Sequence, residues 1–180
     1  MEDPADPQRA LVLLSLFDGI GTARIAVDHA LQEEDLQGKF RTSFYVEKDN
    51  ALAAAVDKYW QERTQQGRGP RHQRLAEDVW DLFRDGMRPL KQVLRAVPIG
   101  GLLLVIGGFP CKQLSVAGPL RGRLGLAGQD SPLFFIFPAL ARAVQELRPD
   151  VIVHILAENA GSMLPANLGV MAQALGLSSP

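Results

Sequence analysis

The side chain best suited to covalent chemistry in this sequence is its single cysteine, Cys111. It follows Leu102–Ile106, an apolar run typical of a fully buried strand. Gly107 and Gly108 should let the backbone turn sharply as that strand ends, and Pro110 stiffens the residue before the thiol. A thiolate is a nucleophile, and open α/β sheets place their chemistry at the carboxyl ends of strands. Judged by position alone, a small buried hydrophobic residue is still the better explanation of Cys111.

A second candidate site is the loop Phe17–Gly21, whose glycines allow close approach of a ligand to the backbone. Glu47, at the end of the next apolar run, could accept hydrogen bonds from ribose hydroxyls or be a solvated charge. Asp78 could accept an adenine amino group or cap a helix. The pyrophosphate fingerprint G-x-G-x-x-G is absent, because Ala23 and Arg24 occupy its last two positions. The loop therefore favours S-adenosylmethionine, which carries no phosphate, over NAD.

The elements that position these residues alternate between apolar runs and helical patterns. This alternation indicates βαβ units, so the expected fold class is α/β, with a parallel, doubly wound, Rossmann-like sheet. Strands are expected at Leu11–Leu16, Ser43–Val46, Leu75–Ala76, Leu102–Ile106 and Val151–Ala157. Helices are expected at Thr22–Leu36, Asn50–Glu62, Asp78–Ala96, Ser131–Leu147 and Met163–Leu177. The polar stretch Arg63–Arg74 is expected to be a loop.

Length and composition set broad limits on the protein. Its 180 residues fit one domain, and the net charge of −1 gives no overall attraction to nucleic acid, so such binding needs local patches. One cysteine excludes an internal disulfide and fits a reducing compartment. The acidic, proline-broken N-terminus is unlike a secretory signal, and the longest apolar run, Ile99–Phe109, is too short to span a bilayer. We therefore expect an intracellular protein without a membrane partner.

The motifs, taken in order, resemble those of the DNA (cytosine-5) methyltransferases. The matching segments are Leu16–Gly21, Glu47 with Asp78, Pro110-Cys111, Asp130–Phe135 and Glu158–Ala160. They look like the family's first motif, its cofactor-binding acids, its nucleophile motif, its next helix-opening motif and its Glu-Asn-Val signature. Cys111–Ser115 and Gly122–Leu126 are closer to the de novo (DNMT3-like) branch than to the bacterial pattern. The match covers roughly residues 11–163.

The resemblance implies methyl transfer from S-adenosylmethionine to C5 of cytosine in DNA. A thiolate that adds to cytosine C6 produces an enamine whose C5 can attack the methyl group, and Cys111 would be that nucleophile. Glu158 would hydrogen-bond the ring at N3 and at its exocyclic amine, while Asn159 would hold the Pro110 loop. The implied cofactor-binding residues are Phe17, Asp18, Gly19, Gly21, Glu47, Asp78, Val79 and Leu133. No metal is expected.

DNA contacts are expected from the glycine-rich segment Ser115–Gln129, because the target base must leave the stack to reach the thiol. Its contact residues would be Ser115, Arg121 and Arg123. A second basic group lies in the polar stretch that follows the second helix, and it could touch the DNA backbone or simply be solvated. Its members are Arg63, Arg68, Arg71 and Arg74.

The sequence also departs from the family. Ala160 replaces the usual valine, and the strand hairpin, arginine motif and target-recognition region do not follow. The expected domain is thus the N-terminal catalytic half, residues 11–177 after a disordered tail at 1–10, with its C-terminal part missing and little activity alone. The alternatives are an inactive regulatory or truncated paralogue and an RNA cytosine-5 methyltransferase. The expected partners are DNA and another methyltransferase subunit, and the expected location is the nucleus if the source is eukaryotic.

Overall fold

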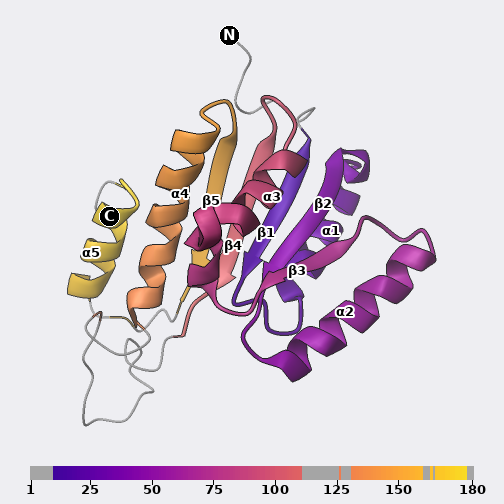
Figure 1. The fold of residues 1–180 in the computed structure, drawn as a ribbon, viewed down its shortest axis with the longest axis horizontal. Helices are drawn as coiled ribbons and strands as arrows, with labels where there is room; N and C mark the ends of the chain where they lie inside the picture. The colour runs from indigo at the N-terminus through magenta and orange to yellow at the C-terminus, as the bar shows by residue number, and fades with distance from the viewer. Residues whose placement is uncertain (1–9, 111–125, 127–130, 160–162, 164, 178–180) are drawn as a thin grey trace.

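Five parallel strands form one sheet at the centre of the computed structural model (Figure 1), which describes residues 10–110, 126, 131–159, 163 and 165–177. The strands are β1 (Leu11–Leu16), β2 (Phe40–Val46), β3 (His72–Ala76), β4 (Leu102–Gly108) and β5 (Ile152–Glu158). Their order across the sheet is β3-β2-β1-β4-β5, with every neighbouring pair parallel. The order reverses at β1, as in doubly wound sheets, and this confirms the predicted α/β, Rossmann-like class.

Helices cover both faces of this sheet (Figure 1). On one face lie α3 (Arg88–Ala96), α4 (Ile136–Leu147) and α5 (Pro165–Ala174). On the other face lie α1 (Thr22–Glu33) and α2 (Asn50–Gln65). None of the helices in the described ranges is long and apolar enough to cross a membrane.

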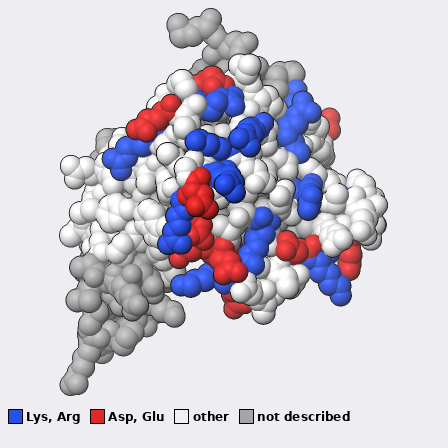
Figure 2. All heavy atoms as spheres, viewed as in Figure 1, with Lys and Arg blue, Asp and Glu red and all other residues white. Residues whose placement is uncertain are grey.

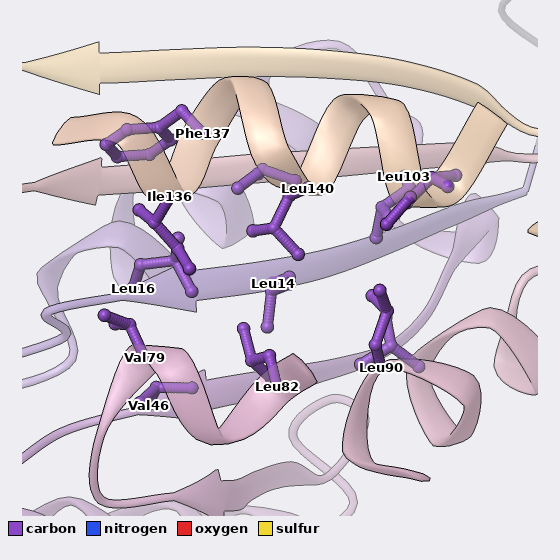
Figure 3. Packing of buried hydrophobic residues seen from close by; sticks show 14 of the residues in the cluster. Leu14, Leu16, Val46, Val79, Leu82, Leu90, Leu103, Ile136, Phe137 and Leu140 are labelled. Carbon is purple, nitrogen blue, oxygen red and sulfur yellow. The ribbon is translucent and has the colours of Figure 1, made fainter. Parts of the chain in front are cut away.

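The main hydrophobic core lies between the sheet and α3 and α4 (Figure 3). Leu14 and Leu103 from the strands meet Leu90 of α3 and Phe137 and Leu140 of α4, and all five are fully buried. All six residues of β1 are buried, as expected for the central strand of a parallel sheet whose two faces are covered. This rigid core fixes the carboxyl ends of the strands, where the predicted site residues stand.

Strand β3 corrects the expectation that Arg63–Arg74 is a loop. The strand begins at His72 and pairs with β2, placing His72 opposite Ser43 and Arg74 opposite Tyr45. The polar sequence of β3 gives no apolar pattern by which a strand could be predicted. Its buried side chain, His72, contacts the polar side chains of Ser43 and Asp18. β2 is also longer than predicted, since it begins at Phe40.

The expected helix Asp78–Ala96 is wrong as one element. Two 3₁₀ turns, Val79–Phe83 and Asp85–Met87, precede α3. Gly86 and Met87 take φ values of 63° and 60°, in the left-handed region, which interrupts a right-handed helix. The expected helix Ser131–Leu147 likewise begins with a 3₁₀ turn over its first five residues before α4 starts.

The glycine pair before Pro110 also differs from expectation. Gly107 and Gly108 lie inside β4, in register with Ala157 and Glu158 of β5, and neither has a positive φ. A Cβ at Gly107 would lie 2.8 Å from the carbonyl oxygen of Leu16. These glycines therefore serve close approach between strands, and not a sharp turn.

Candidate functional site

A cavity of about 430 Å³ lies at the carboxyl edge of the sheet. Its walls come from the segments that follow β1, β2, β3 and β4 and from the start of the turn before α4. The lining residues are Phe17, Val46, Glu47, Lys48, Glu77, Asp78, Val79, Gly108, Pro110 and Leu133. The fold thus brings together five of the eight residues predicted to bind the cofactor, from segments far apart in the sequence.

The loop after β1 is held in an unusual backbone conformation. Phe17 has a φ of 55°, and Gly19 and Gly21 have φ values of 59° and 80°. A positive φ at a non-glycine residue costs on the order of 1–3 kcal/mol, and such strain concentrates at functional sites. The conformation leaves the half-buried Phe17 ring at the cavity wall, with its centroid 6.5 Å from that of Phe137 in the core.

The Glu47 side chain, which lines the cavity, is held by two backbone amides. One carboxylate oxygen accepts from the Gly19 amide at 2.7 Å, and the other accepts from the Asp49 amide at 2.7 Å. Each carboxylate oxygen has more than one acceptor position, so both can still accept a hydroxyl proton from a ligand. Two amides therefore fix the direction in which Glu47 presents its free acceptor positions.

Asp78 fits both of the alternatives drawn from the sequence. Its side chain accepts from the Trp80 amide at 2.9 Å, and the Asp81 carboxylate accepts from the Asp78 amide at 3.3 Å. This is the reciprocal arrangement of a capping box at the start of a helical turn. The same residue lines the cavity.

Asp18, Gly19 and Gly21 are predicted cofactor residues that do not line the cavity. The Asp18 carboxylate is buried beneath the loop, where it accepts a hydrogen bond from the Ser15 hydroxyl and lies 3.3 Å from Nε2 of His72. These contacts anchor the loop after β1 to the buried side chains of β1 and β3.

A buried polar network continues from Asp18, and sequence reasoning missed it. Nδ1 of His72 lies 2.8 Å from the Ser43 hydroxyl, which also accepts from Nη1 of Arg24 at 2.8 Å. The only sequence signal is a serine inside each of two apolar strands, Ser15 in β1 and Ser43 in β2. Without the fold, nothing indicates that Ser43 contacts His72 or that Ser15 contacts Asp18.

Arg24, which departs from the glycine fingerprint, is a structural residue. It is fully buried, its guanidinium lies 4.0 Å from the centre of the Phe40 ring, and it pairs with Asp28 at 3.0 Å. Burial lowers the pKa of Arg24 to about 10, although Asp28 opposes this shift. The side chain therefore stays charged at neutral pH and ties α1 to β2.

The residues predicted for catalysis and for DNA contact are only partly within the described part of the chain. Cys111, Ser115, Arg121 and Arg123 lie outside them, whereas Pro110 lines the cavity.

Glu158 is exposed at the end of β5, directly beside Gly108 of β4. A Cβ at Gly108 would lie 2.9 Å from Oε2 of Glu158. Asn159 donates to the carbonyl oxygen of Phe109 at 3.0 Å. Two of the predicted catalytic residues thus lie against the segment that leads to Cys111.

The second basic group does not form one surface. Arg63 stacks against Tyr59 and Trp60 and lines a cavity of about 240 Å³ together with Arg68. Arg71 and Arg74 line a different cavity, of about 480 Å³.

Figure 2 shows that Lys and Arg gather over α3 on the face of the molecule in view. Arg88, Lys91 and Arg95 are the exposed cations of that helix. In the described part of the chain, no three His, Cys, Asp or Glu side chains come together in a way that could hold a metal ion.

Two known proteins that are similar to this chain come from a plant. Over 133 residues the chain is 32% identical to DNA (cytosine-5)-methyltransferase DRM1 of Arabidopsis thaliana. Over 135 residues it is 33% identical to DNA (cytosine-5)-methyltransferase DRM2 of the same plant. Each match covers 74% of this chain and 19% of the plant protein, so the chain spans about a fifth of the length of these relatives. No protein-family model matches the sequence.

Proposed function

Because the chain is similar to two plant DNA (cytosine-5)-methyltransferases over 74% of its length, we propose that it is a member of this family, binds S-adenosylmethionine and transfers the methyl group to C5 of cytosine in DNA. The observation that carries the proposal is the cavity at the carboxyl edge of the sheet. It combines carboxylates from the ends of β2 and β3 with apolar side chains and with Pro110, the residue before the thiol.

The lining of the cavity fits this cofactor. Its volume, about 430 Å³, is within the usual range for small-molecule sites. Glu47 would accept from the ribose hydroxyls, Asp78 would accept from the adenine amino group, and Phe17 and Leu133 would contact apolar parts of the molecule. The cofactor supplies an electrophilic methyl group when bound.

On the catalytic side, the Cys111 thiolate would add to C6 of a cytosine that has left the stack. Glu158 would hydrogen-bond N3 and the exocyclic amine as electron density enters the ring. After C5 has attacked the methyl group, loss of the C5 proton would expel the thiolate and restore the aromatic ring. The position of Glu158 beside Gly108, and the Asn159 hydrogen bond to Phe109, support this assignment because both tie β5 to the Cys111 segment.

Ser115, Arg121 and Arg123 would contact the DNA strand near the target base. We further propose that a second methyltransferase subunit assists the chain, and that it acts inside the cell, in the nucleus of a eukaryote. A DNA substrate agrees with the names of both plant relatives.

Isothermal titration of the chain with S-adenosylhomocysteine tests the cofactor site. Binding is expected, and Glu47→Ala should weaken it more than about tenfold, since a charged hydrogen bond contributes about 1.5–3 kcal/mol. Glu62→Ala is the matched control, because Glu62 is exposed on α2, away from the lining residues, and should leave the affinity unchanged. No heat from a folded protein at millimolar ligand would refute the proposed function.

A further inference from the structure

We propose that Arg74 is a positioning residue of the cofactor site, which acts through Glu47 without touching the cofactor. This inference rests on the function proposed above. Arg74 belongs to β3 and does not line the cofactor cavity.

Arg74 reaches the cofactor site through the main chain of Glu47. Its Nη2 donates to the Glu47 carbonyl oxygen at 2.5 Å, which is a short, charge-assisted contact. The Glu47 carboxylate is held at the same time by the amides of Gly19 and Asp49. Of these three hydrogen bonds to Glu47, the bond from Arg74 is the one that comes from a side chain, so a substitution can remove it.

An irregularity in the sheet brings Arg74 to this place. β2 and β3 pair Tyr45 with Arg74, but the next pair is Val46 with Ala76, so one residue of β3 is skipped. Such bulges redirect side chains and are frequent beside active sites. The pairing of β2 with β3 ends at Val46, directly before Glu47. The Arg74 guanidinium donates to the carbonyl oxygen of Glu47, the first residue after the paired part of β2.

Arg74 lies in a half-buried, polar environment. Its buried Nε has no hydrogen-bond partner among the described residues. Tyr45, its neighbour across the strands, donates to Asp57 at 2.7 Å, and Asp57 shares a polar cavity with Arg74. Arg74 thus differs from Arg71, which lines the same cavity but is exposed.

The hydrogen bonds from Arg74, Gly19 and Asp49 together hold Glu47 and its carboxylate in one position at the end of β2. If Glu47 accepts from the ribose hydroxyls, loss of the Arg74 hydrogen bond should weaken only the part of the affinity that those hydroxyls provide. An overall loss of stability would instead weaken the binding of every ligand alike. This difference separates a positioning role from a merely structural one.

The test compares two ligands on Arg74→Met, a change that keeps an apolar stem of similar length. S-adenosylhomocysteine should lose about tenfold in affinity, the scale of one charge-assisted hydrogen bond. Its 2′,3′-dideoxy analogue should change less than about twofold, because it has no hydroxyl for Glu47 to accept from. In the double variant Arg74→Met/Glu47→Gln, the loss for S-adenosylhomocysteine should not exceed that of Glu47→Gln alone. Arg71→Met is the matched control and should bind both ligands as the unsubstituted chain does.

Hydrogen exchange of the ligand-free chain gives a readout that is independent of the cofactor. Arg74→Met should speed exchange at the amides of Gly19 and Asp49, whereas Arg71→Met should not, and Arg74→Lys should restore part of the protection. Equal losses for the two ligands, additive effects in the double variant or unchanged exchange would each overturn the proposal. If the unsubstituted chain binds neither ligand, the proposed function fails, and the exchange rates still decide the role of Arg74.

Discussion

The described residues of the proposed catalytic site come from the ends of two neighbouring strands. Pro110 follows β4, Glu158 ends β5, and Asn159 bonds the carbonyl oxygen of Phe109. Because β4 and β5 are parallel and in register up to Gly108 and Glu158, the carboxylate lies at the point where the Cys111 segment leaves the sheet. The pairing of β4 with β5 thus brings Glu158 beside the segment that leads to the proposed nucleophile.

This arrangement leads to a prediction for Cys111→Ser. Transfer of a tritiated methyl group to DNA should fall to background, because a serine hydroxyl is a far weaker nucleophile than a thiolate. Affinity for S-adenosylhomocysteine should stay within about twofold, since no contact with the cofactor is lost. Glu158→Gln should slow transfer severely while DNA binding, measured by fluorescence anisotropy, is retained. Methyl incorporation that persists in Cys111→Ser would exclude the nucleophile role.

At the scale of elements, the close packing of β4 depends on a residue without a side chain. A Cβ at Gly107 would meet the Leu16 carbonyl oxygen at 2.8 Å, the Leu16 Cβ at 3.0 Å and the Phe137 ring at 3.1 Å. Two of these atoms belong to β1 and one to α4, so relief requires that strands or helix shift.

Gly107→Ala should therefore lower the free energy of unfolding by about 1–3 kcal/mol, as overpacking does in other cores. The control is Gly169→Ala in α5, where a Cβ would meet no atom within 4 Å. That change should stabilise the protein by up to about 1 kcal/mol, because alanine favours a helix more than glycine does. Urea denaturation measures both, and equal effects of the two substitutions would contradict this account.

Arg148 links three elements at the opposite edge of the sheet. It donates to the Leu94 carbonyl oxygen at the end of α3 and to the Asp150 carboxylate that precedes β5. The hydrogen bond from Arg148 lowers the pKa of Asp150 from 3.8 to about 2.

A pH dependence of stability follows from this pair. Since the folded-state pKa of Asp150 lies below its unfolded value, the stabilisation is complete above about pH 4 and is lost as the pH falls through 2. The difference in free energy of unfolding between the unsubstituted chain and Asp150→Asn should therefore shrink from pH 6 toward pH 2. The corresponding difference for Glu146→Gln, an exposed residue of α4, should not follow that course. A constant difference for Asp150→Asn would contradict the role of the pair.

In the whole molecule, the two faces of the sheet are covered unequally. The core side carries α3, α4 and α5, whereas α1 and α2 on the other side pack mainly over β1, β2 and β3. On that second side Leu156 of β5 is 58% exposed, while Leu14 of β1, on the core side, is 0% exposed. The free energy of unfolding should therefore depend mainly on the core between the sheet and α3, α4 and α5.

A matched pair of substitutions tests this asymmetry. Leu14→Ala should cost about 2–5 kcal/mol of unfolding free energy, the range for leucines removed from closed cores. Leu156→Ala should cost less than about 1 kcal/mol, because little of its surface leaves water on folding. Similar costs in chemical denaturation would mean that a cover over β5 forms in solution.

The sequence by itself determined the class of the fold and the order of its motifs. Apolar runs such as Leu11–Leu16 form strands wherever they are buried on both sides, and this signal needs no knowledge of neighbours. The resemblance to the family was also visible in the sequence, because the motif residues keep their order along the chain, and the similarity to the two plant methyltransferases agrees with it. The roles assigned to single site residues, Cys111 and Glu158 above all, remain predictions.

Only the tertiary structure decided which polar residues face one another. β3 exists because its polar side chains find partners on β2 and on the loop after β1, as His72 does with Ser43 and Asp18. The fold also brings the Asp18 carboxylate to the Ser15 hydroxyl and the Arg74 guanidinium to the Glu47 carbonyl oxygen. A hydrogen bond between residues 27 or 54 positions apart leaves no periodic pattern in the chain, since its partners meet only after the strands have paired.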